Sequence, residues 1–347
     1  SLNDIFKPIY SVITILGLFP YSVKYQVNKH KYTILRKSIY FNSIYGVSVV
    51  LTIFVFLVLH IREVFFTSDS SPITDVLLTK INYVIELTIL MIFIIVTYVN
   101  AFINRHKYIK MLNTIMSTYH DLLKHKNVTD LKPYNSVQTI QFVMILFYYV
   151  TIMLLVILLS SLEKQITELH KTNEDKCFVQ MKTQTFTVRQ IELLYTKAYE
   201  AKTDINIIFQ YPLLVCIFEC FYGIVNEALI LYQSLFVEKC ITVYEIFTFS
   251  FWIIFHLLKI FLLASSGHAL KIKVRKIGLA LLDIPTEGHD VRWHMEIQHF
   301  LRVISYKNIV IVLFDSISLD ASLMYNTLCS ASLFLIILVQ IDRTIIK

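Results

Sequence analysis

The segment SLMYNTLCSASLFLIILVQI, residues 322–341, contains no charged side chain and is followed at once by Asp342. A helix of twenty residues is about 30 Å long, which matches the hydrocarbon thickness of a bilayer. The segment carries an amide, Gln340, near its end, and a polar group in lipid normally faces a partner or a water-filled cavity. We therefore expect a membrane-spanning helix that lines a pore.

The composition of the whole chain sets its class. Of 347 residues, 56% are apolar and only 16% are charged, with a mean hydropathy of +0.62. These values exclude a water-soluble globular protein. The apolar runs are continuous, whereas the strands of a membrane barrel alternate over about ten residues. We predict an all-α, polytopic membrane protein.

Six apolar segments can be placed from the uncharged runs. They are residues 40–59, 81–103, 133–162, 205–237, 247–266 and 322–341. Glu86 interrupts the second segment, Glu219 and Glu227 lie in the fourth, and Lys259 lies in the fifth. Residues 1–22 are expected to form an amphipathic interfacial helix instead of a cleavable signal peptide.

The basic residues orient the chain, because cytoplasmic loops carry an excess of Lys and Arg. Residues 23–38 contain five basic residues and no acid, and residues 104–133 and 267–308 are also basic. Residues 62–76 carry more acid than base, as an outside loop does. We expect a cytoplasmic N-terminus and an extracellular C-terminus.

In the middle of the chain, the number of apolar segments does not agree with the expected sides of the polar segments. The polar segments 104–133 and 163–206 are both expected inside, which requires an even number of crossings between them. Only one uncharged region, residues 133–162, separates them, and as a helix it would be about 45 Å long. We hypothesise that the end of one span, an outside loop and the start of another are missing between about 140 and 160.

If residues 133–162 are the remains of two spans, the chain has seven spans, and with an inside N-terminus and an outside C-terminus it resembles the insect chemoreceptor channels. Its last helix resembles the gustatory-receptor signature Thr-Tyr, five apolar residues, Gln-Phe, here Leu333-Phe334, LIILV and Gln340-Ile341. The run IFHLLKIFLL at 254–263 resembles the sixth span of that family, and residues 189–214 resemble the helix that enters the fifth span. The chain is thus similar to the insect gustatory receptor family, although only Gln340 of the signature is kept.

The resemblance implies a ligand-gated, non-selective cation channel in the plasma membrane of sensory neurons. It implies a homotetramer, or a hetero-oligomer with related receptors, whose partners are membrane lipid, permeant cations and a small tastant, a sugar or a bitter plant compound. Residues 1–266 would form the transmembrane bundle, with cytoplasmic extensions at 104–133 and 163–206 and a ligand pocket in its outer half. Residues 267–321 would form a cytoplasmic anchor, and residues 322–347 the pore helix and the outside C-terminus.

One face of the last helix has the pattern of a pore lining. On a 3.6-residue period the face carries Asn326, Ser330, Leu333, Ile337 and either Gln340 or Ile341. Four copies would make polar rings, an apolar neck that closes by dewetting, and an amide ring. Asp342 at the mouth would concentrate cations. The alternative is a packed helix whose Gln340 merely lies at the interface.

Polar side chains within the other spans mark a candidate ligand site. Glu86 is one of them; Glu219, Tyr222 and Asn226 share a helical face, and so do Trp252, His256 and Lys259. We expect these stripes to face each other and to line a ligand pocket. The alternative is structural, with Lys259 paired to Glu219 or Glu227 and His256 simply packed. For Lys259 we favour the structural pairing.

Other chemistry is scarce in this sequence. The five cysteines show no ligand-type pairing, and Cys216 and Cys220 read as small hydrophobes within a helix. Asp315 and Asp320 either line inner exits of the pore or cap the last helix. We find no nucleotide, triad or metal motif, so we expect no enzyme and no cofactor. The net charge of +7 reflects basic loops and not nucleic-acid binding.

Three alternatives to a gustatory channel differ in what they require. An odorant-type channel shares the whole architecture. A transporter predicts internal repeats and midplane helices broken by Gly or Pro, which the sequence does not show. A G-protein-coupled receptor requires an outside N-terminus, which the basic segment 23–38 opposes.

Overall fold

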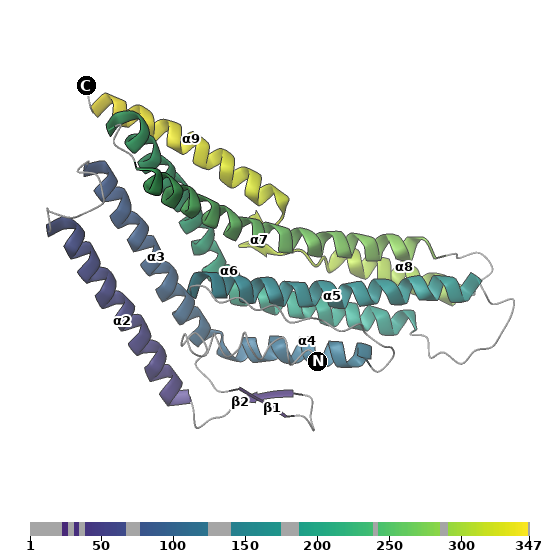
Figure 1. Cartoon of the computed structure of the whole chain (residues 1–347). Coiled ribbons are helices and arrows are strands. Elements are labelled where there is room, and N and C mark those ends of the chain that lie inside the picture. The colour runs from purple at the N-terminus through teal and green to yellow at the C-terminus, as the bar shows by residue number, and fades with distance from the viewer. Residues whose placement is uncertain are drawn as a thin grey trace.

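The structure is a computed structural model that describes residues 23–26, 31–34, 39–66, 77–123, 140–174, 187–238, 242–284 and 291–345. Helices dominate it, as Figure 1 shows, and the predicted all-α class is confirmed. The helices are α2 (Ile39–Phe66), α3 (Leu77–Ile103), α4 (Arg105–Leu123), α5 (Ile140–Glu174), α6 (Val188–Tyr232), the π-helical turn η3 (Gln233–Glu238), α7 (Val243–Leu282), α8 (Val291–Tyr306) and α9 (Ala321–Ile345). The amphipathic helix expected at 1–22 lies outside the described residues.

Two short antiparallel hairpins add to the helices, and the sequence did not reveal them. β1 (Val23–Gln26) pairs with β2 (Lys31–Ile34), and β3 (Val312–Leu313) pairs with β4 (Ile317–Ser318). The second hairpin joins α8 to α9. Phe314 and Asp315 form its turn with positive φ angles of 49° and 53°.

Five helices of the described chain are long and apolar enough to cross a membrane. Their apolar segments are Val84–Ile103, Phe147–Thr167, Val188–Phe236, Val243–Leu282 and Ala321–Ile341. A shorter apolar stretch, Ile44–Leu59, lies in α2. These six correspond to the six segments expected from the uncharged runs, with boundaries shifted where helices extend beyond the apolar part.

The helix α6 is the centre of the fold. It contacts α3, α4, α5, α7, α8 and α9, and its buried residues recur along its whole length. A capping box starts it: the side chain of Thr187 accepts a hydrogen bond from the Gln190 N–H, and the Gln190 side chain accepts one from the Thr187 N–H. Pro212 lies within the helix, which nevertheless continues to Tyr232.

The ends of several helices gather at one end of the molecule, remote from the C-terminus (Figure 1). The ring of Tyr195 at the start of α6 packs on Phe300 of α8, and its hydroxyl donates to the Lys307 carbonyl at 2.9 Å. Lys197 pairs with Asp121 near the end of α4 at 2.9 Å. This end includes described parts of the segments expected to form the helix extensions and the anchor. Its location in the cytoplasm stays a prediction.

The hypothesis that a segment is missing between about 140 and 160 stays a prediction, because the structure contains only the residues of this sequence. α5 is one helix from Ile140 to Glu174, and it packs along α7 and α6. Its long apolar run is explained by burial within protein, since Tyr148, Leu155 and Leu159 are fully buried. Where α5 becomes polar, Glu163 forms an ion pair with Lys273 of α7, with 3.0 Å between the ammonium nitrogen and the carboxylate oxygen. Burial against other helices therefore accounts for an apolar run that is longer than one bilayer span.

The connection into α9 is closely packed. The backbone carbonyl of Leu319 lies so near Gly267 of α7 that a Cβ atom on this glycine would be 1.6 Å from the carbonyl oxygen. Asp320 caps α9, because its carboxylate accepts hydrogen bonds from the backbone N–H and the hydroxyl of Ser322. Lys271 of α7 pairs with the same carboxylate at 3.0 Å. Of the two expectations for Asp320, the capping role is confirmed.

Candidate functional site

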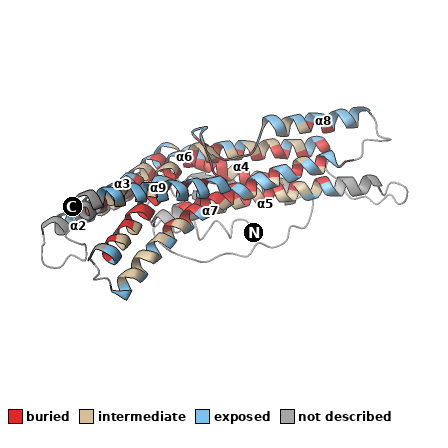
Figure 2. Cartoon of the chain, turned by 90° about the horizontal axis from the view of Figure 1, so that it is seen from above, coloured by how far each residue is buried: buried red, intermediate tan, exposed pale blue. Residues whose placement is uncertain are grey.

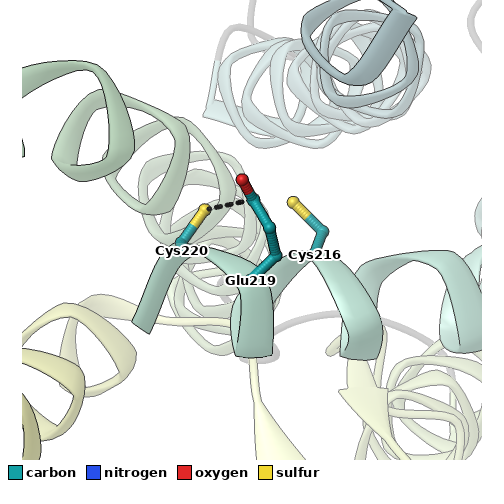
Figure 3. Close-up of side chains that lie close together, drawn as sticks. All are labelled: Cys216, Glu219 and Cys220. Carbon is teal, nitrogen blue, oxygen red and sulfur yellow. Dashed lines mark hydrogen bonds between the residues drawn. The ribbon is translucent and has the colours of Figure 1, made fainter. Parts of the chain in front are cut away.

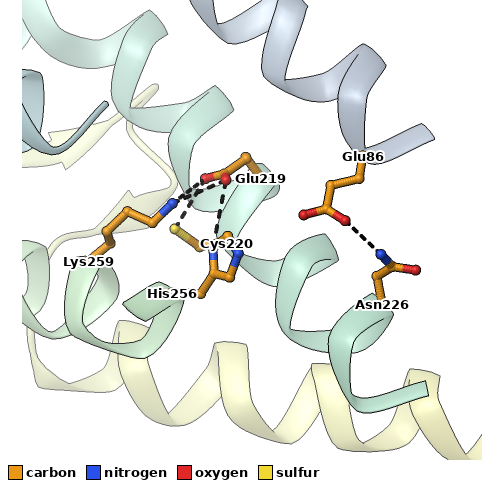
Figure 4. A network of polar contacts seen from close by, with 6 residues as sticks. All are labelled: Glu86, Glu219, Cys220, Asn226, His256 and Lys259. Carbon is orange, nitrogen blue, oxygen red and sulfur yellow. Dashed lines mark hydrogen bonds and ion pairs between the residues drawn. The ribbon is translucent and has the colours of Figure 1, made fainter. Parts of the chain in front are cut away.

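An ion pair between α6 and α7 forms the centre of a buried polar cluster (Figure 4). The ammonium group of Lys259 lies 2.9 and 3.1 Å from the two carboxylate oxygens of Glu219, and both side chains are buried. Burying either charge alone would cost several kcal/mol, of order 3–5. The two helices therefore have to bring the pair together. The predicted pairing of Lys259 is confirmed, and its partner is Glu219 and not Glu227.

His256 approaches the same carboxylate from α7, one turn before Lys259. Its Nδ1 atom lies 3.6 Å from Oε1 of Glu219, beyond hydrogen-bond distance, and the imidazole is buried. The ring fits there because Gly223 of α6 has no side chain: a Cβ atom on Gly223 would lie 2.6 Å from Nε2 of His256. A glycine at this crossing thus decides where the imidazole sits.

A second part of the cluster joins α3 to α6. Asn226 donates its amide to Oε2 of Glu86 at 2.6 Å, and the hydroxyl of Tyr222 donates to Asn82 at 3.0 Å. Two members of the predicted α6 stripe, Tyr222 and Asn226, thus form hydrogen bonds with α3, where Glu86 is one of the partners. Asn82 was missed, although it lies four residues before Glu86 on the same face of α3, a spacing that could have identified it.

Trp252 does not join this cluster. Its side chain is 43% exposed and packs edge to face against Phe251 and Phe255 of its own helix. From Val243 to Phe255 no residue of α7 is buried, and burial begins at His256. The expected stripe of Trp252, His256 and Lys259 is therefore divided, because α7 has few neighbours over its first three turns.

Two cysteines lie beside Glu219 on α6 (Figure 3). The ligand atoms of Cys216, Glu219 and Cys220 all lie within 4.8 Å of one another, and the three residues are buried. The Cys220 thiol donates to Oε2 of Glu219 at 3.5 Å. The structure thus places two thiols and a carboxylate close together, which the interpretation of these cysteines as small hydrophobes did not anticipate. Their spacing of four residues, with a carboxylate between them, is the sequence signal that was overlooked.

The helix α9 packs by one face only. Leu323, Thr327 and Ala331 are its buried residues, and they face α6 and α7. The residues predicted to line a pore lie on exposed parts of the helix, which is mostly pale blue in Figure 2. They are Asn326, Ser330, Leu333, Ile337, Gln340 and Ile341. The side chain of Asp342 lies outside the described residues, so its predicted role stays untested.

Comparisons with known proteins agree with this architecture. The model of the 7tm chemosensory receptor family matches residues 6–137 and 128–345. No curated protein matches the chain. Among solved structures it is similar to the insect olfactory receptor OR5 from Machilis hrabei in complex with eugenol, with a TM-score of 0.67 and 12% identity over 98% of both chains. It is also similar to the structure of OR5 described without eugenol, with a TM-score of 0.58 and 11% identity over 98% of both chains.

The family match covers nearly the whole chain, and the two structural likenesses extend the agreement to the fold. The resemblance to insect chemoreceptors, which rested on a degenerate signature and on the expected topology, is confirmed. The chain belongs to the 7tm chemosensory receptor family.

Proposed function

We propose that this chain is a subunit of a gustatory, ligand-gated, non-selective cation channel. Its subunits would assemble as a homotetramer in the plasma membrane of sensory neurons, with the N-terminus inside and the C-terminus outside. A small tastant, a sugar or a bitter plant compound, would open it. The observation that carries this proposal is the exposed polar and apolar face of α9.

The exposed face of α9 is poorly suited to lipid. Asn326 and Ser330 lie on it, and Gln340 lies one helical turn beyond Ile337. Amide and hydroxyl groups in hydrocarbon cost free energy, whereas a water-filled path satisfies them. Four such faces around an axis would supply polar rings on either side of an apolar neck at Leu333 and Ile337. A neck of this kind conducts when it widens enough to hold water.

The partly buried polar cluster between α3, α6 and α7 supports a ligand site in the same chain. It combines the carboxylate of Glu86, the amides of Asn82 and Asn226 and the hydroxyl of Tyr222. These groups donate and accept hydrogen bonds, which suits the hydroxyls of a sugar or the basic nitrogen of an alkaloid. A ligand that exchanges partners with them would alter the contact of α6 with α3 and, through α6, the packing of α9.

Currents test the pore assignment. In a cell that expresses the chain alone, we expect Gln340→Ala to change permeability ratios or gating while surface expression is kept. Ile337→Ala and Ile336→Ala form a matched pair, since the side chains are 50% and 54% exposed but point about 100° apart. Only Ile337→Ala should change conduction. Unaltered currents in both Gln340→Ala and Ile337→Ala would exclude this face as the pore lining.

The odorant class is the second candidate, favoured by the likeness to an olfactory receptor solved with eugenol. The two classes differ in the ligand and not in the architecture. Screening sugars, bitter alkaloids and volatile phenols such as eugenol on the same cells separates them. A response confined to volatile phenols would replace the gustatory assignment and leave the channel intact.

A further inference from the structure

The thiols of Cys216 and Cys220 have no part in the proposed conduction or ligand binding. They lie on one face of α6, one helical turn apart, with Glu219 between them. Two ligands at positions i and i+4 of a helix can reach the same metal ion, as in helical zinc sites. The ligand atoms are already within 4.8 Å of one another. Zn–S bonds of about 2.3 Å require only small side-chain rotations from this arrangement.

A fourth candidate ligand, His256, comes from another helix; it lies outside the group of three and approaches that group at Glu219. Nδ1 of His256 is a buried nitrogen that makes no hydrogen bond, and it points at Oε1 of Glu219 from 3.6 Å (Figure 4). A buried imidazole nitrogen without a hydrogen-bond partner is unusual and calls for an explanation. A metal ion held by the neighbouring thiolates and Glu219 would provide it.

The charges of the site balance with a divalent ion. Without metal, two neutral thiols and the Glu219–Lys259 pair carry no net charge. Binding of Zn²⁺ releases the two thiol protons to solvent and forms two metal–thiolate bonds. The ion (+2), two thiolates (−2), Glu219 (−1) and Lys259 (+1) again sum to zero. A neutral site avoids the high cost of a net charge in a low-dielectric interior.

We propose that Cys216, Cys220, Glu219 and His256 form a binding site for a thiophilic divalent cation of the zinc class. The donor set of two sulfurs, one imidazole and one carboxylate suits tetrahedral Zn²⁺ or its analogue Cd²⁺ and not Mg²⁺ or Ca²⁺, which take oxygen ligands. The ion bridges α6 to α7 next to the crossing at Gly223. It fixes the distance between these helices.

Direct metal binding tests the site without any need for current. The experiment uses the purified full-length chain in which the other three cysteines are replaced by serine (Cys177→Ser, Cys240→Ser, Cys329→Ser). Cd²⁺ is the probe, and the readout is the thiolate-to-Cd²⁺ charge-transfer absorbance. We expect binding to saturate at about one Cd²⁺ per chain, as a single four-ligand site requires. Equilibrium dialysis with Zn²⁺ should give the same ratio. Absence of the absorbance band, or binding of Mg²⁺ with equal strength, overturns the proposal.

Substitutions assign the ligands. Cys216→Ser with Cys220→Ser should abolish binding, whereas Cys329→Ser alone, at the exposed cysteine of α9, should leave it unchanged. His256→Asn should weaken binding about 10-fold or more. Unchanged binding in the double serine variant overturns the site. If that variant does not fold, the absorbance titration of the chain that keeps only Cys216 and Cys220 still decides.

A functional consequence rests on the proposed channel activity. Zn²⁺ that cross-links α6 to α7 should reduce the ligand-evoked current of the native chain, and not of the double serine variant. If the chain conducts no current but binds Cd²⁺ through its two thiolates, the channel proposal fails and the metal site stands. If the chain conducts current but binds no metal, the metal-site proposal fails and the channel proposal stands.

Discussion

The helices α6 and α9 are both long and apolar, yet they are buried very differently. In the most apolar 18-residue stretch of α6, 56% of the residues are buried within the chain. In the corresponding stretch of α9, 17% of the residues are buried. α6 contacts six other helices, and its buried Glu219 forms an ion pair with Lys259. α9, in contrast, packs on α6 and α7 through one face. Hydropathy does not separate these two situations, since their values are 1.9 and 1.8.

The difference shows where each helix obtains its interactions. α6 finds partners for its polar groups inside the chain, so its substitutions are expected to change folding. Much of α9 faces away from the chain, so substitutions on that face are expected to change assembly or conduction. Four experiments use this contrast, from the largest expected effect to the smallest.

Breaking the ion pair of α6 should have the largest effect. Lys259→Ala leaves the Glu219 carboxylate buried without its cation, which should destabilise the fold by about 3–5 kcal/mol. Thermal unfolding in detergent measures the loss. The control is the double variant Glu219→Leu with Lys259→Met, which should recover most of the stability because both charges are removed. Equal losses in the single and double variants would show that the pair has no role of its own.

The two faces of α9 can be compared with one substitution type. Leu323→Ala, on the buried face at 6% exposure, should cost about 2–5 kcal/mol because it leaves a cavity. Leu333→Ala, at 65% exposure, should change the stability of the single chain by less than about 0.5 kcal/mol. The same Leu333→Ala variant should alter conduction if this face forms the neck. A large loss of stability in both variants would mean that α9 is packed on both faces.

The close approach of α7 to the start of α9 can be tested with glycines. Gly267→Ala places a Cβ atom against the Leu319 carbonyl, so the backbone has to move, at a cost of about 1–3 kcal/mol. Gly278→Ala on the same helix is the control, since its Cβ atom would meet nothing within 4 Å. That control should gain about 0.5–1 kcal/mol from the better helix propensity of alanine. Similar unfolding temperatures for the two variants would contradict the close packing at Gly267.

Removal of the cap of α9 should have the smallest effect. Asp320→Ala should cost about 0.5–2 kcal/mol, the usual range for an N-cap. Hydrogen bonds from Ser322 and the ammonium group of Lys271 lower the pKa of Asp320 from its ordinary 3.8 to about 2. A lowered pKa stabilises the folded state above pH 3.8, and this part is lost as the pH falls towards 2. Between pH 3.8 and 2, the free energy of unfolding of Asp320→Asn should therefore fall less than that of the native chain.

Much of the fold could be predicted from the sequence. The uncharged runs identified the six apolar segments, because a membrane span requires about twenty residues without charge. The helical spacing of Glu219, Tyr222 and Asn226, and of His256 and Lys259, correctly grouped most of the polar cluster. Spacing along one helix is a local property, so the sequence contains it.

The tertiary structure decided the rest. The sequence did not reveal that Lys259 selects Glu219 over Glu227, or that Trp252 lies outside the cluster. Each of these depends on which helices are neighbours and at what rotation. The periodicity of a single helix does not contain that information. The sequence alone determined that this is a helical membrane protein with polar stripes; only the packing of α3, α6, α7 and α9 decided which stripes meet and which stay exposed, because burial is a property of neighbouring helices.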